Sequence, residues 1–170
     1  MFSSRSPIIN AYVGLGSNLG DRAGNLLLAV RGMMEASLEV IRLSAVYESE
    51  AVETFPQPAF LNMVAELRGN TLPTPEQVMA RLLRIEYALG RTREVPHGPR
   101  TIDLDLLFYR DEKRATQFLT LPHPRLQQRR FVLEPLAELC PNLVHPMLRQ
   151  TIGELLHQSS DTSAVKRWLN

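Results

Sequence analysis

Residues 98–109 read GPRTIDLDLLFY, and this stretch decides both the fold and the candidate site. The alternation of polar and apolar residues predicts a β-strand over residues 102–109. Side chains two positions apart share one face of a strand, so Asp103 and Asp105 are expected about 7 Å apart on one face, with the apolar residues turned to the core. Two such carboxylates repel each other, and a hard cation such as Mg²⁺ would relieve the repulsion. An ordinary strand with a solvated acidic face carries the same pattern.

Arginines flank the two acids on the N-terminal side. Arg91 and Arg93 follow a predicted helix that stops at Gly90, and Arg100 lies just before the acidic strand. The guanidinium group is flat and matches phosphate oxygens with two parallel hydrogen bonds. Arginine together with Mg²⁺ stabilises charge on a transferring phosphoryl group. Simple ion pairs between the arginines and the acids are the plainer interpretation.

The rest of the chain alternates between helical and strand periodicity. A helix over about 75–89 has the clearest start, because Thr74, Pro75 and Gln77 form a capping box with proline at the first helical position. We also expect strands at 8–16, 38–48, 60–68 and 102–109, a helix at 24–36, a short strand near 115–121, and short helices at 131–139 and 151–158. This β-α-β-β-α-β order predicts a ferredoxin-like α+β sandwich with a mostly antiparallel sheet and extra C-terminal helices.

Length, composition and charge limit the class of protein to which the chain can belong. With 170 residues, 44% of them apolar, the chain fits one domain over residues 1–170, with flexible ends at 1–7 and from about 158 to 170. The net charge of +1 gives no strong field for nucleic acid or for a membrane surface. No apolar run is long enough to span a bilayer and no signal peptide is recognisable, so we expect a cytoplasmic protein. Cys140 is the only cysteine, which excludes an internal disulfide.

Several motifs resemble those of one enzyme family. The run GPRTIDLD at residues 98–105 resembles the signature of the 6-hydroxymethyl-7,8-dihydropterin pyrophosphokinases. Other similar segments are the family's first strand and loop at 14–19, its third strand at 60–62, and its last motif at 121–124 and 129–133. Together, and in the family's order, these segments span residues 11 to about 157.

The resemblance implies a fold, a reaction and a set of site residues. It implies a ferredoxin-like fold, with ATP and 6-hydroxymethyl-7,8-dihydropterin as substrates, two Mg²⁺ ions and a monomeric enzyme of folate biosynthesis. The β- and γ-phosphates would pass as a unit to the pterin hydroxymethyl oxygen, and AMP would leave. By position it assigns Asp103 and Asp105 to metal binding and catalysis; Arg91 and Arg100 to catalysis; Glu86, Arg93, His97, Arg100, Leu106, Thr120, His123 and Arg129 to ATP; and Ser49, Val52, Phe60, Asn62 and Phe131 to the pterin.

Other interpretations of the same residues stay open. A Mg²⁺-dependent nucleotide hydrolase would use the same acids and arginines with water as the acceptor. A ferredoxin-like RNA-binding module is disfavoured, because the strands lack interleaved aromatic residues and the charge is near balance. His123, between two prolines, fits either polyphosphate binding or a surface turn. Phe60 and Phe131 fit either a sandwich around a flat heterocycle or the core.

Overall fold

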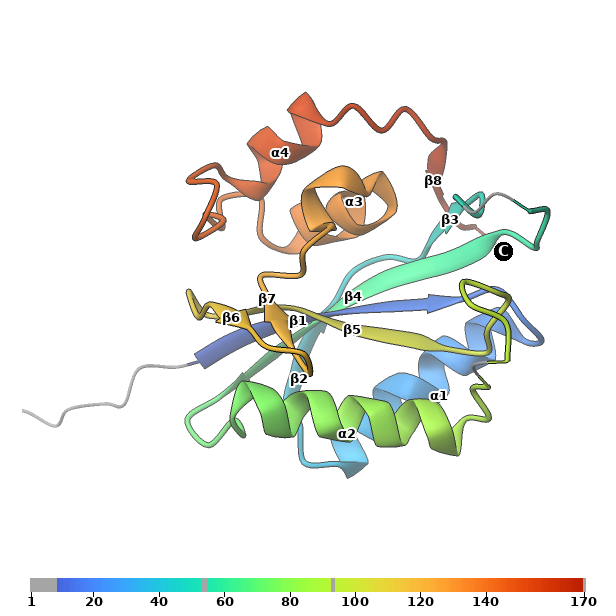
Figure 1. Cartoon of the computed structure of the whole chain (residues 1–170), viewed down its shortest axis with the longest axis horizontal. Coiled ribbons are helices and arrows are strands. Elements are labelled where there is room, and N and C mark those ends of the chain that lie inside the picture. Colours follow the sequence, from blue (N-terminus) through green and yellow to red (C-terminus); the bar gives the residue numbers. More distant parts are fainter. Residues whose placement is uncertain (1–8, 53–54, 93, 170) are drawn as a thin grey trace, which may run out of the picture.

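The computed structural model describes residues 9–52, 55–92 and 94–169. A central sheet is covered on both faces by helices, with α1 and α2 below it and α3 and α4 above it in Figure 1. Along the chain the elements are β1 (Ile9–Ser17), α1 (Arg22–Glu35), β2 (Val40–Leu43), β3 (Tyr47–Ser49), β4 (Phe60–Gly69), α2 (Pro75–Ala88), β5 (Asp103–Tyr109), β6 (Arg114–Ala115), β7 (Thr120–Leu121), a 3₁₀ turn (Leu126–Gln128), α3 (Arg130–Leu139), α4 (Ile152–Gln158) and β8 (Val165–Arg167).

The sheet topology agrees with the predicted fold class. The strand order is β5-β1-β4-β3-β8, β2 also pairs with β4, and the pairs are antiparallel. The β-α-β-β-α-β order over β1 to β5 is confirmed, with the second strand divided into β2 and β3. Within the described ranges, no helix has the length and apolar character needed to cross a membrane.

The second strand is divided by one extra residue. Leu43 pairs with Ala65 and Tyr47 with Asn62, so the β2–β3 side uses one more residue than β4 between the two pairs. At the break, the Ser44 hydroxyl accepts the backbone N–H of the facing β4 at 2.9 Å. The prediction of one continuous strand over 38–48 was wrong here, because a bulge leaves little trace in apolar alternation.

Two hydrophobic clusters occupy the two faces of the sheet. Val13 and Leu15 of β1 lie in the cluster that contains the buried residues of α1 and α2, whereas Tyr12 lies in the cluster shared with α3 and α4. Gly14 and Gly16 follow Tyr12 on that second face by strand alternation. Because they carry no side chain, the sheet surface beyond α3 stays open.

A β-bulge in β5 redirects side chains next to the acids. Tyr12 pairs with Phe108 and Val13 with Leu106, which leaves Leu107 as an extra residue. Leu106 packs against α1 and α2 and Leu107 lies on the α3 face, as alternation requires, and the bulge places Phe108 on the α3 face as well. The bulge marks the boundary between the acidic and the apolar parts of this face.

The end of the chain is more ordered than the sequence predicts. Fraying from about residue 158 was expected, but β8 pairs with β3, and Trp168 N donates to the Val46 carbonyl at 2.8 Å. The prediction is therefore wrong for residues 165–168. Residues 1–7, also predicted to be flexible, lie outside the described residues.

Candidate active site

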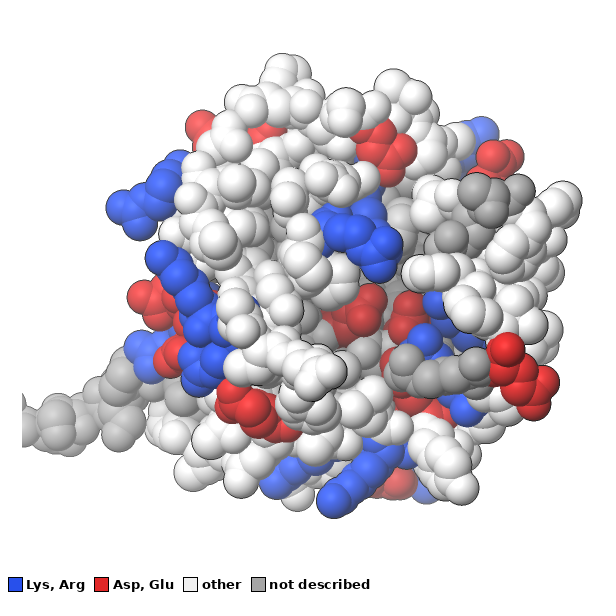
Figure 2. Space-filling view, viewed as in Figure 1, with Lys and Arg blue, Asp and Glu red and all other residues white. Residues whose placement is uncertain are grey.

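A cleft of about 490 Å³ opens on the α3 face of the sheet. Its floor is formed by β1 and β5, and its walls by the loop over residues 91–100, by β3 and β4, and by the N-terminal end of α3. A Cβ added to Gly16 would lie 3.3 Å from Asn62 Oδ1, so a side chain there would crowd the floor. Figure 2 shows acidic side chains recessed in a hollow near the middle of this face, with basic side chains around it.

Asp103 and Asp105 share the floor, as strand alternation predicts. Their side chains are 27% and 36% exposed. Burial in the cleft and the neighbouring Asp103 carboxylate raise the pKa of Asp105 to about 7. In the part of the chain that the structure describes, no group of three His, Cys or acidic residues forms a metal cage. A cation held by these two carboxylates would complete its shell with water and phosphate oxygens, which suits Mg²⁺.

Arg91 is fixed against the acids by a residue behind the cleft wall. Its Nη1 donates to Asp103 Oδ1 at 2.5 Å and to Glu86 Oε1 at 2.6 Å. The same Glu86 oxygen accepts the backbone N–H of Leu104 at 2.7 Å. Glu86 is only 3% exposed and belongs to α2. Glu86 therefore connects α2, β5 and Arg91 through hydrogen bonds.

Hydrogen bonds fix the backbone of Arg100, whereas the side-chain donor Nε has no acceptor among the described residues. Arg100 N donates to Asn18 Oδ1 at 2.9 Å, and Asn18 N donates to the Arg100 carbonyl at 3.2 Å. The guanidinium carbon lies 5.1 Å from the centre of the Phe60 ring. Arg100 Nε is buried without a hydrogen-bond partner, 3.8 Å from Asp103 Oδ2. A buried donor without an acceptor is costly, so this one favours an anionic ligand in the cleft.

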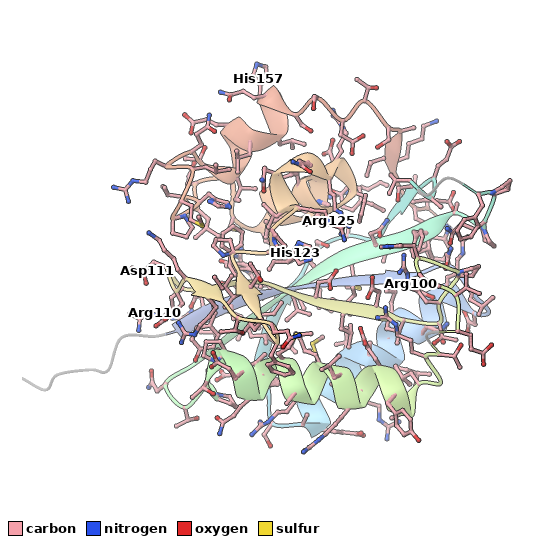
Figure 3. All side chains as sticks on the ribbon, viewed as in Figure 1. Arg100, Arg110, Asp111, His123, Arg125 and His157 are labelled. Carbon is pink, nitrogen blue, oxygen red and sulfur yellow. The ribbon has the colours of Figure 1, made fainter. Side chains whose placement is uncertain are left out.

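His123 closes the other side of the acidic floor. Its Nε2 lies 3.9 Å from Asp105 Oδ2, and its Nδ1 accepts the backbone N–H of Arg125 at 3.4 Å. Burial, followed by the positive charges of Arg129 and Arg125, lowers the pKa of His123 to about 4. The imidazole is therefore neutral at pH 7, with its Nε2–H directed at the floor. In Figure 3, Arg100 lies on the loop before β5, while His123 and Arg125 come from the segment between β7 and α3.

The far side of the cleft is aromatic with a small polar edge. Phe60 of β4 and Phe131 of α3 both line it. Asn62 Nδ2 donates to Ser49 Oγ at 2.9 Å, and both residues are buried. Aromatic faces with an amide at their edge fit a flat heterocycle that carries donors and acceptors.

Most of the residues singled out from the sequence meet in this cleft. The lining includes Ser49, Val52, Phe60, Asn62, Arg91, His97, Arg100, Asp103, Asp105, His123, Arg129 and Phe131. Arg93 lies outside the described residues. The structure does not bring three others to the lining. Glu86 is buried behind it, Leu106 is 2% exposed on the core face with Leu104, and Thr120 is exposed on the β6–β7 hairpin.

Some lining residues were missed from the sequence. Leu107 lines the cleft on the strand face that carries Asp103 and Asp105, so strand alternation was an available signal for it. Arg125 also lines the cleft, from the loop that contains His123. A second basic residue two positions after His123 was an available signal that this loop binds an anion. Gly14 and Gly16, which form the floor, were visible only as a turn-like run at the end of a strand.

The sequence is similar to one well-defined family. A family model described as 7,8-dihydro-6-hydroxymethylpterin-pyrophosphokinase (HPPK) matches residues 12–141. A protein of Aquifex aeolicus named 2-amino-4-hydroxy-6-hydroxymethyldihydropteridine pyrophosphokinase is 41% identical, over 84% of this chain and 88% of that protein. The Bacillus subtilis protein of the same name is 40% identical, over 93% of this chain and 89% of its own length. A Pisum sativum protein named folate synthesis bifunctional protein is 40% identical, over 75% of this chain and 24% of its length.

Solved structures agree on the fold. An HPPK-DHPS structure in complex with substrates has a TM-score of 0.69 at 14% sequence identity. The match covers 89% of this chain and 43% of that one, so the chain spans less than half of the solved protein. A Plasmodium falciparum HPPK-DHPS structure with pteroate gives a TM-score of 0.67 at 15% identity. At such identities the likeness supports the fold alone.

Proposed function

Because the chain belongs to the 7,8-dihydro-6-hydroxymethylpterin-pyrophosphokinase family, it is a pyrophosphokinase of folate biosynthesis, and we propose that the cleft over Asp103 and Asp105 is its active site. The enzyme moves a pyrophosphoryl group from ATP to the hydroxymethyl oxygen of 6-hydroxymethyl-7,8-dihydropterin, and AMP leaves. The family resemblance drawn from the motifs is thereby confirmed.

One observation carries the assignment of the site. Asp103 Oδ1 lies 2.5 Å from Arg91 Nη1, and Asp103 Oδ2 lies 3.8 Å from Arg100 Nε. Among the described residues, no third protein ligand joins Asp103 and Asp105, and Arg100 Nε has no acceptor. That donor set fits a cation and a polyphosphate together, because each would satisfy what the other leaves unpaired. Asp103 and Asp105 would hold Mg²⁺, two ions in our proposal, which when bound neutralises phosphate charge and lowers the pKa of the pterin hydroxyl.

The pterin would occupy the aromatic half of the cleft. Phe60 and Phe131 offer ring faces, and Asn62 offers an amide edge whose orientation Ser49 fixes. Val52, exposed on the loop after β3, would cover the open side. Transfer would require the hydroxymethyl group to face the acidic floor, where the phosphates would lie.

ATP would occupy the basic half. Arg91 and Arg100 would contact the transferring group, while His97, His123 and Arg129 line the space beyond it. His123 is neutral, so it contributes a hydrogen-bond donor without a charge. Glu86, Leu106 and Thr120 have no direct part in this proposal; Glu86 acts through Arg91. We also propose that the enzyme works as a monomer.

The protein's contribution to the chemistry is positioning and charge. A pyrophosphoryl transfer needs an aligned alcohol, a neutralised polyphosphate and exclusion of water. Arg91 is held rigidly by Glu86 and Asp103, so little reorganisation is needed when charge develops on the phosphates. The loop over residues 91–100 lies along the cleft wall and would limit water access.

The direct experiment is nucleotide analysis with and without the pterin. We expect AMP to form from MgATP only when 6-hydroxymethyl-7,8-dihydropterin is present, and to be lost in Asp103→Asn. Formation of ADP, or ATP consumption indifferent to the pterin, would instead indicate a nucleotide hydrolase and contradict the proposal.

A further inference from the structure

Helix α3 lacks a cap from its own N-terminal residue. Asp21, Thr74 and Thr151 each cap the helix that follows them, for α1, α2 and α4 respectively. Arg129, the corresponding residue of α3, makes no side-chain cap hydrogen bond, and the first turn of α3 contains no acidic residue. A helix end without such partners leaves backbone donors unsatisfied and its dipole uncompensated.

The missing cap comes from the end of the chain. Asp161 Oδ2 accepts the backbone N–H of Arg130, the first residue of α3, at 2.8 Å across 31 positions of sequence. Its other oxygen accepts from Ser163 N at 2.9 Å and from Ser163 Oγ at 2.6 Å. Partial burial opposes ionisation of Asp161, but these hydrogen bonds lower its pKa, so it is charged at neutral pH.

Helix α3 depends on the hydrogen bond with Asp161 because it is short and contains a proline. It covers only Arg130–Leu139, and Pro135 inside it lacks the N–H that would bond back to the preceding turn. The first turn is also the part that faces the cleft, where Arg129 and Phe131 belong to the lining. The guanidinium of Arg129 lies 5.6 Å from the centre of the Phe131 ring. Displacement of this turn would move both side chains.

The same segment is anchored on the opposite wall of the cleft. After Asp161 the chain runs across to β8, which lies beside β3 in Figure 1. Val165 pairs with Ser49, and Ser49 accepts the amide of Asn62 within the cleft wall. We call residues 159–168 the C-terminal strap. The match to the family model covers residues 12–141, so this segment lies outside the matched part of the chain.

We infer that Asp161 is a positioning residue for the pterin side of the cleft. By capping α3 from a distance it fixes Phe131 on one wall, while β8 steadies Ser49 on the other. The inference rests on the proposed function, because it concerns the pterin half of that site. It assigns to the strap a role in substrate affinity in addition to its contribution to stability.

The test compares Asp161→Ala with a matched loss of a helix cap elsewhere. Glu154→Ala removes the second half of the capping box of α4, whose residues do not line the cleft. We expect Asp161→Ala to raise KM for the pterin by about fivefold to tenfold, the range that loss of one helix cap represents. Its kcat should change less than about twofold, because the lost contacts bind the pterin ring equally in the ground state and in the transition state. Glu154→Ala should leave both constants unchanged.

Ser163→Ala provides a milder variant, should Asp161→Ala be poorly folded. It removes only the 2.6 Å hydrogen bond to Asp161, and we expect a rise of about twofold to threefold in the same KM. A KM for the pterin within experimental error of wild type in both strap variants would overturn the inference. An equal rise in Glu154→Ala would overturn it as well.

A second readout needs no substrate. Amide hydrogen exchange of residues 130–133 should be faster in Asp161→Ala by about tenfold, with no change in the first turn of α4. If wild type formed no pterin-dependent AMP, the proposed function would fail, while the exchange result would still decide whether Asp161 anchors α3. Unchanged amide exchange in α3 would contradict the claim that Asp161 anchors this helix.

Discussion

At the residue scale, the paired carboxylates make the sharpest prediction. Asp105→Asn removes the charge that would bind the metal while keeping the shape of the side chain. We expect kcat to fall by on the order of a thousandfold, because a catalytic metal contributes several kcal/mol of stabilisation. Asp111→Asn is the matched control. Asp111 is exposed in the turn after β5, far from the cleft (Figure 3), and its loss should leave the rate unchanged.

Circular dichroism and thermal melting would show that both variants are folded. An Asp105→Asn enzyme with a rate near wild type would contradict the assignment of Asp105 as a metal ligand.

The raised pKa of Asp105 predicts that magnesium and protons compete. An unfolded Asp titrates near pH 4, whereas in the fold the pKa of Asp105 is about 7. Between these values the folded metal-free protein holds the extra proton, so this group's contribution to the free energy of unfolding falls as pH rises through that window. Mg²⁺ requires the ionised carboxylate. We therefore expect Mg²⁺ to raise the melting temperature more at pH 8 than at pH 6.

Calorimetry should also detect proton release when Mg²⁺ binds at pH 6. In Asp105→Asn the difference between the two pH values should disappear. Equal stabilisation of wild type at pH 6 and pH 8 would contradict the coupling.

Individual residues show what a sequence can and cannot reveal. Strand alternation was sufficient to predict that Asp103 and Asp105 share a face, because that periodicity is purely local. Leu106 was assigned to ATP through the family resemblance, although the same alternation places it on the core face with Leu104. The bulge instead turns Phe108 to the α3 face, and it arises from pairing with β1, which local pattern does not record. Glu86 offered a usable signal: with Val78 and Leu82 it continues the buried stripe of α2 at intervals of four. A charged residue on such a stripe indicates a buried partner, and here the partner is Arg91.

At the element scale, the loop over residues 91–100 is tied to the loop before β4. Gln57 Nε2 donates to the His97 carbonyl at 3.1 Å, and Gln57 Oε1 accepts from Asn18 Nδ2 at 3.0 Å. His97 itself has a positive φ of 57°, a conformation that a residue with a side chain adopts only under constraint. Gln57 thus helps to hold a strained wall of the cleft in place.

Gln57→Ala should loosen that wall. Of the two hydrogen bonds that are lost, the one to the His97 carbonyl holds the loop. One neutral hydrogen bond is worth about 1 kcal/mol, so we expect KM for ATP to rise by about fivefold. Amide exchange at Gly98, whose N–H bonds to the Val95 carbonyl, should be faster by a similar factor. Gln117→Ala, an exposed position outside the cleft lining, is the control. No change in either readout for Gln57→Ala would mean that the loop is held by other contacts.

Elements with strong local signals were predicted well. The capping box that starts α2 is present, with Gln77 N donating to Thr74 Oγ1. The first helix begins at Arg22, slightly before the predicted start, because Asp21 accepts from Gly24 N and caps it. β8 was missed because three residues with mixed exposure carry no periodic signal. Its pairing with β3 depends on a contact across more than half of the chain.

At the scale of the whole molecule, the lone cysteine reports on the integrity of the fold. Burial raises the pKa of the Cys140 thiol to about 12, so almost no thiolate exists in the folded protein at pH 8. Modification by a thiol reagent should be on the order of a thousandfold slower than in the urea-unfolded chain. Measured against denaturant, the rate should follow global unfolding. A fast reaction in the native protein would show that the α3 side of the sheet opens locally.

The overall arrangement explains why the cleft lies where it does. Helices α1 and α2 cover one face of the sheet, while α3 and α4 cover only part of the other. The uncovered part has glycines on β1 and acids on β5, and two regions of the chain, before β5 and before α3, supply its arginines and histidines. The fold class could be predicted from the order of elements. The closure of the cleft could not, because it depends on long-range contacts of α3 and the strap.

The central claim is that this cleft transfers two phosphates as one unit to a pterin. Phosphorus NMR of a reaction with MgATP and 6-hydroxymethyl-7,8-dihydropterin tests it most directly. We predict that AMP and a new ester with two coupled phosphorus signals appear together in wild type, and that neither appears in Asp105→Asn. A product with a single phosphorus signal and ADP, or the same diphosphate product from Asp105→Asn at an unchanged rate, would contradict the account.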